Sequence, residues 1–353
     1  MTDNGALADV LSRLEKFPHT SLALLPTPMQ QLRNLGSHIG VPGLWMKRDD
    51  LTGLEGGGNK TRKLEYIVGD ALASGADMLV TVGAIQSNHT RQTAAAAARS
   101  GLKCSLLHCA WTEDASPQYR TVGNVLISHL IGADLYVDET VRPIEDQGPL
   151  KEFMTQLREQ GHDPYLIPGG ASEHRLGCFG YIQCAAEIAV QAKHAGIDFD
   201  YVVHCTGSSS TQAGLLAGFA ALGVRTHVVG VSDDDEIEIK KARVLELANN
   251  ALRELDLAVR ISTEDVEVIS SSSNAYGVPD EEIVSGIQLL AHKEGLVADP
   301  VYEGRAIRGL LNLVDEGRFA KNTKILLMHL GGTPAIHAYA RRFGTVQLNQ
   351  FRA

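Results

Sequence analysis

Short apolar runs alternate with amphipathic runs along this chain. The apolar runs that begin at Met78, Ser105, Tyr201 and Lys324 read MLVTVGA, SLLHC, YVVHC and KILLMHL, and an amphipathic run follows each of them. This alternation predicts parallel strands with helices on both faces of a sheet. The pattern occupies both halves of the chain, so the predicted fold class is α/β throughout.

A polar stretch from residue 139 to 164 interrupts the alternation and has no clear period. Domain boundaries fall in polar segments of this kind, so the stretch is the best candidate for a boundary between two lobes. The length of 353 residues agrees with a division into about two domains.

Composition and charge exclude several classes of protein. Hydrophobic residues make up 44% and charged residues 21% of the chain, which is typical of a globular protein. The net charge of −10 repels phosphate backbones, so we expect no nucleic-acid partner. No apolar run approaches the roughly 18 residues of a membrane span, and the N-terminus mixes acidic and basic residues. We therefore expect a cytoplasmic protein without a membrane partner.

Cysteines and histidines give no sign of a metal site. The five cysteines include no C-x-x-C pair, and the thirteen histidines include no H-E-x-x-H pair. Reduced thiols and no bound metal are the expectation.

A glycine-rich loop with a lysine precedes a predicted helix. Three successive glycines end at Gly58 and are followed by Asn59 and Lys60, after which Leu64 and Ile67 lie at helical spacing. A P-loop requires Gly directly before Lys, and Asn59 occupies that place, so a nucleoside triphosphate site is disfavoured. Taken alone, the loop is better explained as a flexible turn with a solvated lysine.

Two further polar loops follow predicted strands and open predicted helices. They are Gln86-Ser87-Asn88-His89 and the hydroxyl-rich segment 206–214. In open α/β sheets ligands bind beyond the carboxyl ends of strands, and a helix N-terminus offers N–H groups to a carboxylate or phosphate. The second loop lacks a GK[ST] pattern, so it suits a single phosphate. Simple helix capping by Ser and Asn is the alternative for both loops.

Five segments in this order resemble one enzyme family. They are GGNKTRKLEY at 57–66, QSNHTRQ at 86–92, STQAG at 210–214, DPVYEG at 299–304 and HLGG at 329–332. Together they resemble the pyridoxal-phosphate enzymes of the tryptophan-synthase-β fold. The branch they resemble holds 1-aminocyclopropane-1-carboxylate deaminase, D-cysteine desulfhydrase and cysteate sulfo-lyase.

The resemblance implies the fold, the cofactor and the partners. It implies pyridoxal 5'-phosphate fold type II, with two lobes of open twisted parallel sheets and helices on both faces. The smaller lobe would span residues 53–164, inserted in a larger lobe of residues 1–52 and 165–353. A small amino-acid substrate and a homodimer are further expectations.

The resemblance also implies roles for individual residues. Lys60 would hold the cofactor as a Schiff base, and burial would favour its neutral form. Glu303 would face the pyridine nitrogen and keep it protonated. Further cofactor contacts are implied for Asn59, Asn88, Gly207, Ser208, Ser209, Ser210, Thr211 and Leu330. Catalytic or substrate contacts are implied for Gln86, Ser87, Asn88, His89, Tyr276 and Tyr302, with Ser87 and the two tyrosines as catalytic groups beside Lys60.

The implied activity is conversion of a small amino acid to a 2-oxo acid and ammonia. Glu303, Leu330 and the segment 172–174 resemble the deaminase, which opens a cyclopropane ring. His89 resembles the desulfhydrases instead, because the deaminase pattern has Gln at that position. The prediction is a deaminase-like enzyme, with β-elimination from D-cysteine or cysteate as the alternative and a third, related amino acid left open. A non-catalytic binding protein on this scaffold is the alternative from another class, and the presence of Lys60 disfavours it.

Overall fold

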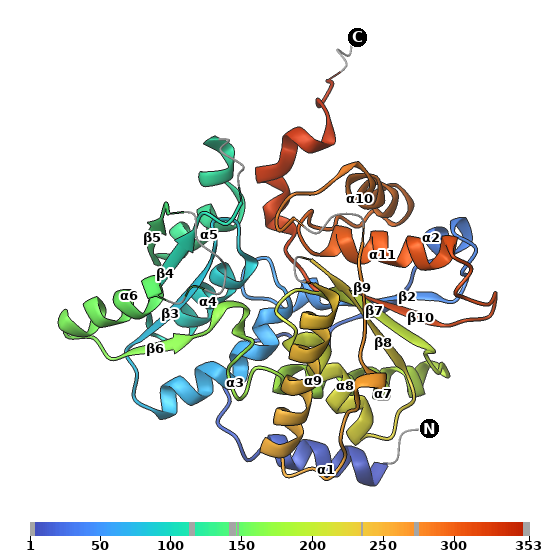
Figure 1. The fold of residues 1–353 in the computed structure, drawn as a ribbon, viewed down its shortest axis with the longest axis horizontal. Coiled ribbons are helices and arrows are strands. Elements are labelled where there is room, and N and C mark those ends of the chain that lie inside the picture. Colours follow the sequence, from blue (N-terminus) through green and yellow to red (C-terminus); the bar gives the residue numbers. More distant parts are fainter. Residues whose placement is uncertain are drawn as a thin grey trace.

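Two sheets with their covering helices form the molecule (Figure 1). The computed structural model describes residues 4–112, 117–140, 146, 148–233, 236–271 and 275–348. The larger sheet has the strand order β1-β2-β10-β7-β8-β9 and the smaller one β5-β4-β3-β6. Every pairing is parallel except that of β1 with β2 at one edge of the larger sheet. The predicted α/β fold with parallel sheets is confirmed.

The strands and helices have the following bounds. The larger sheet consists of β1 (Met29–Gln31), β2 (Leu44–Arg48), β7 (Tyr201–Thr206), β8 (His227–Ser232), β9 (Glu267–Ile269) and β10 (Ile325–His329). The smaller sheet consists of β3 (Met78–Ala84), β4 (Lys103–Cys109), β5 (Asp134–Asp138) and β6 (Pro164–Ile167). The α-helices are α1 (Asn4–Leu14), α2 (Arg33–His38), α3 (Asn59–Ala73), α4 (Asn88–Arg99), α5 (Gly123–Ile131), α6 (Gly148–Glu159), α7 (Phe179–Ala195), α8 (Ser210–Ala221), α9 (Ile237–Glu254), α10 (Glu281–Glu294) and α11 (Glu303–Asp315). Short 3-10 helices are η1 (Asp49–Leu51), η2 (Pro117–Arg120), η3 (Gly169–Ala171), η4 (Thr263–Asp265) and η5 (Thr333–Phe343).

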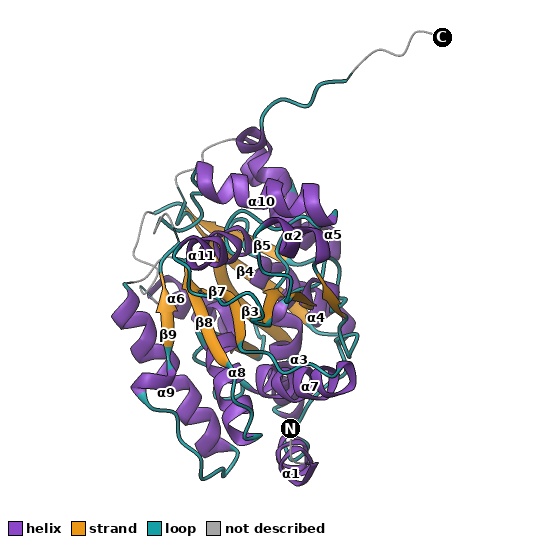
Figure 2. Cartoon of the chain, turned by 90° about the vertical axis from the view of Figure 1, so that its right-hand side faces the viewer, coloured by secondary structure: helices purple, strands orange, loops and turns teal. Residues whose placement is uncertain are grey.

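Both sheets are covered on both faces, which explains why their central strands are apolar along their whole length. All residues of β3 and β10 are buried. In the larger sheet α2, α10 and α11 cover one face, and α7, α8 and α9 cover the other (Figures 1 and 2). In the smaller sheet α4 packs on β3 and β4, and α6 packs on β3 and β6.

One hydrophobic core runs through both sheets. It contains Leu79 and Leu106 from the smaller sheet, Val202 and Val228 from the larger sheet, and Leu64 of α3. Helix α3 packs against α4 on one side and α7 on the other, so it fills the space between the two layers. The position of α3 is therefore set from both sides.

The stretch 139–164 contains a helix that its polar composition conceals. Helix α6 buries Leu150, Phe153, Met154 and Leu157. These residues follow the i, i+3, i+4, i+7 spacing of one helical face. Strand β6 then pairs with β3 as far as Ile167, so the smaller sheet reaches beyond residue 164. The exact division into lobes stays a prediction.

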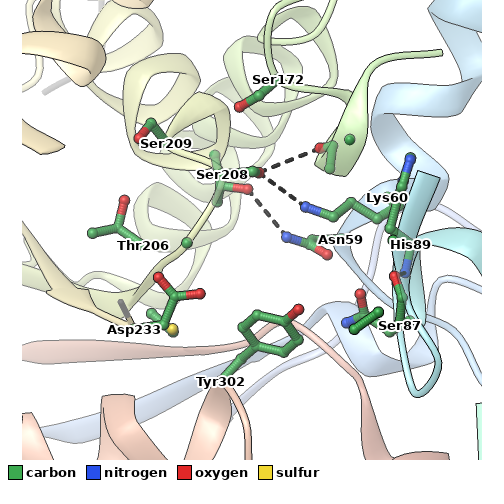
Figure 3. A pocket seen from close by; sticks show the side chains of 18 of the residues that line it. Asn59, Lys60, Ser87, His89, Ser172, Thr206, Ser208, Ser209, Asp233 and Tyr302 are labelled. Atoms are coloured by element: carbon green, nitrogen blue, oxygen red, sulfur yellow. Dashed lines mark hydrogen bonds between the residues drawn. The ribbon is translucent and has the colours of Figure 1, made fainter. Parts of the chain in front are cut away.

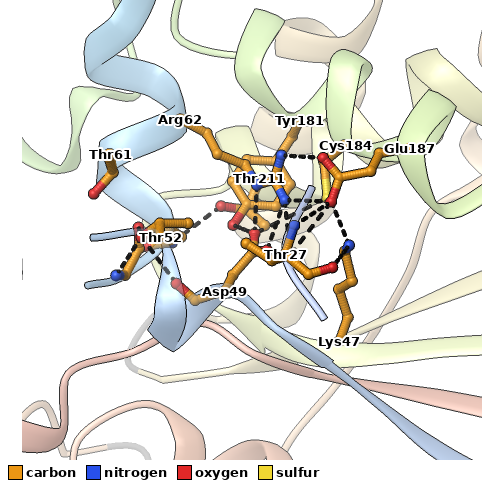
Figure 4. Close-up of polar contacts among 12 residues, drawn as sticks. Thr27, Lys47, Asp49, Thr52, Thr61, Arg62, Tyr181, Cys184, Glu187 and Thr211 are labelled. Atoms are coloured by element: carbon orange, nitrogen blue, oxygen red, sulfur yellow. Dashed lines mark hydrogen bonds and ion pairs between the residues drawn. The ribbon is translucent and has the colours of Figure 1, made fainter. Parts of the chain in front are cut away.

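A buried cluster of ion pairs fixes the first turns of α3 (Figure 4). Arg62 donates to both carboxylate oxygens of Asp49 at 2.8 Å and to Glu187 Oε2 at 3.0 Å. Lys47 also donates to Glu187, and Tyr181 Oη donates to Asp49 Oδ2 at 2.7 Å. Burial alone would raise the pKa of Asp49, but the Arg62 guanidinium holds it below its ordinary value. The cluster therefore joins α3 to β2 and α7 through charged groups.

None of the helices in the described part of the chain combines the length and the apolar character that crossing a bilayer requires.

Candidate functional site

A cavity lies beyond the carboxyl ends of strands from both sheets (Figure 3). It has a volume of about 260 Å³ and is lined by residues at the ends of β3 and β7 and directly after β8 and β10. Strand β3 lies between β4 and β6, and β7 lies between β8 and β10, so the strand order reverses at both places although the strands are parallel. This is where open α/β sheets bind ligands.

Most of the predicted site residues line this cavity. They are Asn59, Lys60, Ser87, Asn88, His89, Gly207, Ser208, Ser209, Thr211, Tyr276, Tyr302, Glu303 and Leu330. They come from six segments that are distant in the sequence, and the fold brings these segments together around one space.

Gln86 and Ser210 are not among the lining residues. The Gln86 amide donates to the carbonyls of Tyr119 and Val122 at 2.6 and 2.8 Å and accepts from Asn124 N at 3.0 Å, so it orders the loop before α5. The Ser210 hydroxyl accepts from Lys63 Nζ at 2.7 Å. Both side chains therefore bind other groups of the protein and do not line the cavity.

Lys60 lies in the first turn of α3 with its amine in the cavity. Its Nζ donates to Ser208 Oγ at 3.1 Å, a contact drawn in Figure 3. Burial lowers the pKa of Lys60 from 10.5 to about 8. The amine is therefore neutral and nucleophilic near neutral pH far more often than that of an exposed lysine.

The loop before Lys60 needs its glycines. Gly56, Gly57 and Gly58 have φ values of 82°, 56° and 131°. A Cβ on Gly57 would lie 1.8 Å from the carbonyl oxygen of Asp50. Arg91 of α4 donates to the Gly57 carbonyl at 2.7 Å, so the loop is held in place and is not a flexible turn.

Helix α4 begins at the cavity with a capped first turn. The Ser87 hydroxyl accepts from the backbone N–H groups of His89 and Thr90 at 3.2 and 3.3 Å. The capping interpretation is thus correct for Ser87, but the same helix start also lines the cavity. Its N–H groups and dipole favour an anionic group there.

His89 is held in one tautomer. The Thr81 hydroxyl has a single proton and donates it to the Ile167 carbonyl at 2.7 Å. Its contact of 2.8 Å with His89 Nε2 therefore requires that Nε2 carries a proton and donates. Burial, followed by Lys60 and Lys63, holds the pKa of His89 well below 6.5, so the ring is neutral. Nδ1 is then an acceptor, and it has no hydrogen-bond partner among the described residues.

A second helix start, that of α8, supplies hydroxyl groups and backbone N–H groups. Ser209 has a φ of 65° and directly precedes α8. Its hydroxyl and that of Thr206 are buried without a partner in the described ranges. Thr211 Oγ1 accepts from Asn59 Nδ2 at 3.2 Å, and Lys63 contacts the same helix start through Ser210. Hydroxyls, backbone N–H groups and a lysine are the groups that bind a phosphate.

A buried carboxyl group and two tyrosines form another part of the wall. Glu303 begins α11 and is 3% exposed. Burial raises its pKa well above 4.5, and Asp299 adds to this effect. Its Oε1 has no hydrogen-bond partner in the part of the chain that the structure describes. The hydroxyls of Tyr276 and Tyr302 lie 2.6 Å apart, so a proton can pass between them.

The structure adds lining residues that sequence reasoning missed. Trp111 follows β4 and Asp233 follows β8. Ser172, whose segment 172–174 carried part of the resemblance without a site role, follows β6 after a short 3-10 helix and also lines the cavity. The signal that could have found them is the rule that ligands bind beyond carboxyl ends, applied to every strand. Lys63 was also missed, because a lysine one helical turn after Lys60 looks like surface charge, whereas it is fully buried.

Comparisons with known proteins agree with this geometry. Residues 20–331 match the family described as "Pyridoxal-phosphate dependent enzyme". A 1-aminocyclopropane-1-carboxylate deaminase of Bradyrhizobium diazoefficiens is 42% identical over 94% of this chain and 99% of that relative. One from a Methylobacterium species is 41% identical over 95% and 99%.

Solved structures give the same picture at the level of the fold. A crystal structure of an ACC deaminase homologue superimposes with a TM-score of 0.85 at 34% identity, covering 95% of this chain and 98% of that one. O-ureido-L-serine synthase, at 16% identity, has a TM-score of 0.65 and covers 96% and 95%, which shows a shared fold.

Proposed function

The chain belongs to the pyridoxal-phosphate-dependent enzymes, and from this premise we propose that it opens and deaminates 1-aminocyclopropane-1-carboxylate. The products would be 2-oxobutanoate and ammonia, formed with one water. The sequence similarity to deaminases of this name, over 94% of the chain, supports the substrate. The observation that carries the proposal is the buried Glu303 carboxyl group, with one oxygen unpartnered among the described residues, in the same cavity as Lys60.

The residues present fit pyridoxal phosphate. The unpartnered hydroxyls of Thr206 and Ser209 beside the start of α8 suit its phosphate, and Lys60 suits its aldehyde. The unpartnered Glu303 oxygen suits the protonated ring nitrogen. When bound, the cofactor supplies an electron sink for the bonds around the substrate α-carbon.

The chain's own groups would then bind the substrate and move protons. The start of α4, with Ser87 and Asn88, would bind the substrate carboxylate. The neutral amine of Lys60 would take up and return protons near the α-carbon. The hydroxyl pair of Tyr276 and Tyr302 would transfer a proton at Oη. Glu303 would hold the proton at the ring nitrogen, which strengthens electron withdrawal for a substrate that has no α-proton to remove.

The test is an assay of 2-oxo acid and ammonia release from four substrates. These are 1-aminocyclopropane-1-carboxylate, D-cysteine, L-cysteate and D-serine, each incubated with the cofactor-loaded protein. Equal amounts of 2-oxobutanoate and ammonia from the cyclopropane would support the proposal. A protein that ignores the cyclopropane but eliminates from cysteine or cysteate would contradict it.

The second candidate is β-elimination from a small amino acid such as D-cysteine or cysteate. The observation that favours it is His89, whose Nδ1 is an acceptor that can take up a proton, because β-elimination removes an α-proton that the cyclopropane lacks. A glutamine amide at this position could not take up a proton. A His89→Gln variant should therefore raise the ratio of ring opening to elimination if His89 sets the preference. A Gln variant with an unchanged ratio would remove this support.

A further inference from the structure

Asp299 is a fully buried carboxylate that does not line the cavity. Its Oδ2 accepts from the backbone N–H groups of Val301 and Tyr302 at 2.8 and 3.0 Å, and its Oδ1 accepts from Glu303 N at 2.9 Å. The Asp299 carbonyl also accepts from Gly304 N at 2.9 Å. One residue therefore satisfies four successive N–H groups at the start of α11, which would otherwise be orphaned.

The turn held in this way presents two cavity residues side by side. Tyr302 and Glu303 both line the cavity, and their backbone N–H groups are bound directly by the Asp299 carboxylate. A helix start can be capped by many side chains, but only a carboxylate accepts three N–H groups at once while adding a negative charge. Its charge also raises the pKa of Glu303 further above the ordinary value.

A second segment of the cavity wall packs against the same carboxylate. A Cβ on Gly332 would lie 2.8 Å from Asp299 Cγ, and one on Gly331 would lie 2.5 Å from Gly58 Cα. The backbone carbonyl of Leu330 accepts from Asn59 N at 2.8 Å. The segment 330–332 thus lies between Asp299 and the loop that carries Lys60.

We propose that Asp299 is a positioning residue that sets the placement of Glu303 and Tyr302 relative to the Lys60 loop. It acts through the turn 301–304 and through the glycine contacts of segment 330–332, without touching the ligand. The inference rests on the proposed function for what Glu303 binds. A carboxylate that served only to stabilise α11 would leave the affinity and the orientation of the bound cofactor unchanged in a folded variant.

The experiment compares Asp299→Asn with wild-type protein and with Glu303→Gln. Cofactor-stripped full-length chain is titrated with pyridoxal phosphate to obtain the dissociation constant, and the visible circular dichroism of the bound cofactor reports its orientation. The amide presents one acceptor in place of two carboxylate oxygens and has no charge. The cofactor dissociation constant should rise about tenfold or more, as loss of charge-assisted hydrogen bonds predicts. The dichroism should shift towards that of Glu303→Gln.

Asp265→Asn is the matched control. Asp265 accepts from the Ser262 N–H at 2.7 Å in the exposed capping box of η4, so the same chemical change is made at a helix start away from the cavity. Both readouts should equal those of wild-type protein in this variant. Neither readout needs a substrate, so a protein that binds the cofactor normally but does not open the cyclopropane would contradict the proposed function alone.

Asp299→Ser is the second variant, because a serine hydroxyl can cap a helix start without a charge. It should fold and give readouts at least as far from those of wild-type protein as Asp299→Asn, because it also lacks the charge and the second acceptor oxygen. A folded Asp299→Asn protein with wild-type affinity and dichroism would overturn the proposal. Failure of both variants to fold would also overturn it, since it would assign Asp299 to the stability of the whole chain.

Discussion

At the scale of single residues, the site depends on groups whose proton affinities are shifted by burial. Lys60 has a pKa of about 8, while the pKa of Glu303 is raised well above its ordinary value. The amine therefore releases a proton more readily than usual, and the carboxyl group keeps one. This separation of acid and base roles is typical of active sites.

The shifted pKa of Lys60 predicts a pH dependence. Only the neutral amine attacks an aldehyde, so the rate of cofactor attachment should rise with pH up to and through about 8, and then level off. The measurement is the growth of visible absorbance after pyridoxal phosphate is added to cofactor-stripped protein. Borohydride should then fix the label on the peptide that contains Lys60. A label on Lys63 would contradict the assignment, and Lys60→Ala should bind the cofactor without turnover.

The tautomer of His89 is a second prediction at this scale. The ¹⁵N chemical shifts of its imidazole should show a protonated Nε2 and a bare Nδ1, and they should not titrate above pH 6.5 because the pKa is lowered. The signals are identified by their loss in His89→Gln. Thr81→Val removes the acceptor for Nε2, so both tautomers should become populated. A proton on Nδ1 in the wild-type protein would show that Thr81 does not fix the ring.

Two residues together should decide the reaction. In the Glu303→Thr, Leu330→Thr variant the ring nitrogen loses its acidic partner, so ring opening of the cyclopropane should fall on the order of 100-fold or more, the usual effect of losing one electrostatic contact. Elimination from D-cysteine should persist or increase. Assays of both proteins on both substrates provide the measurement. An equal loss of ring opening and of elimination would contradict the expectation that only ring opening depends on the Glu303 carboxyl group.

At the scale of secondary-structure elements, helix α3 is the part that carries the reactive amine, and charged groups hold it. Arg62 and Asp49 are fully buried and bound to each other. A buried ion pair adds little net stability, but the loss of one partner leaves an unpaired buried charge. The cluster therefore specifies where α3 lies more than it strengthens the fold.

Removing Arg62 should thus be costly. Arg62→Met leaves Asp49 and Glu187 without their main partner, and the free energy of unfolding should drop by about 3–5 kcal/mol, measured by urea denaturation. Lys241→Met, which breaks the exposed pair with Glu238, is the control and should change little. Equal losses in the two variants would show that burial of the pair is unimportant.

The sequence predicted the elements whose pattern is set by burial on both faces. Strands β3 and β10 are continuous apolar runs and were placed correctly, because parallel sheets bury every residue of such strands. Helix α6 was missed because charged residues separate its four apolar positions. The site loops were found because each is a run of polar residues directly after a recognisable apolar strand. Asp233 and Trp111 are single residues after strands, and no local pattern marks them. The inward turn of Gln86 towards residues 119–124 depends on tertiary contacts that a sequence does not display.

At the scale of the whole molecule, the cavity is built from both sheets and from the segments between them. Ser87 and His89 belong to the smaller sheet's side, Ser208 and Glu303 to the larger sheet's side, and Lys60 to the helix between them. A ligand bound there contacts every layer of the molecule. Its binding energy is therefore linked to the stability of the entire chain.

This arrangement predicts how the protein responds to its cofactor. At 100 times the dissociation constant, pyridoxal phosphate should stabilise the native state by about 2.7 kcal/mol and raise the melting temperature. Amide hydrogen exchange should slow in β3 and α4 as well as in β7 and α8. Lys60→Ala, loaded to the same degree, separates covalent from non-covalent stabilisation. Protection confined to one sheet would show that the ligand contacts only one side.

The strands of the two sheets are connected through the loop before Lys60 and through residues 168–172. Asn59 and Lys60, directly after the first connection, and Gly170 of the second line the cavity. A rotation displaces atoms in proportion to their distance from its axis. Any swing of the smaller sheet about these two connections would carry the outer strand β5 and helix α6 through the widest arcs. Lys60 and Gly170, next to the pivot, would travel least. Such a movement would open or narrow the entrance of the cavity while the Lys60 amine stays in place.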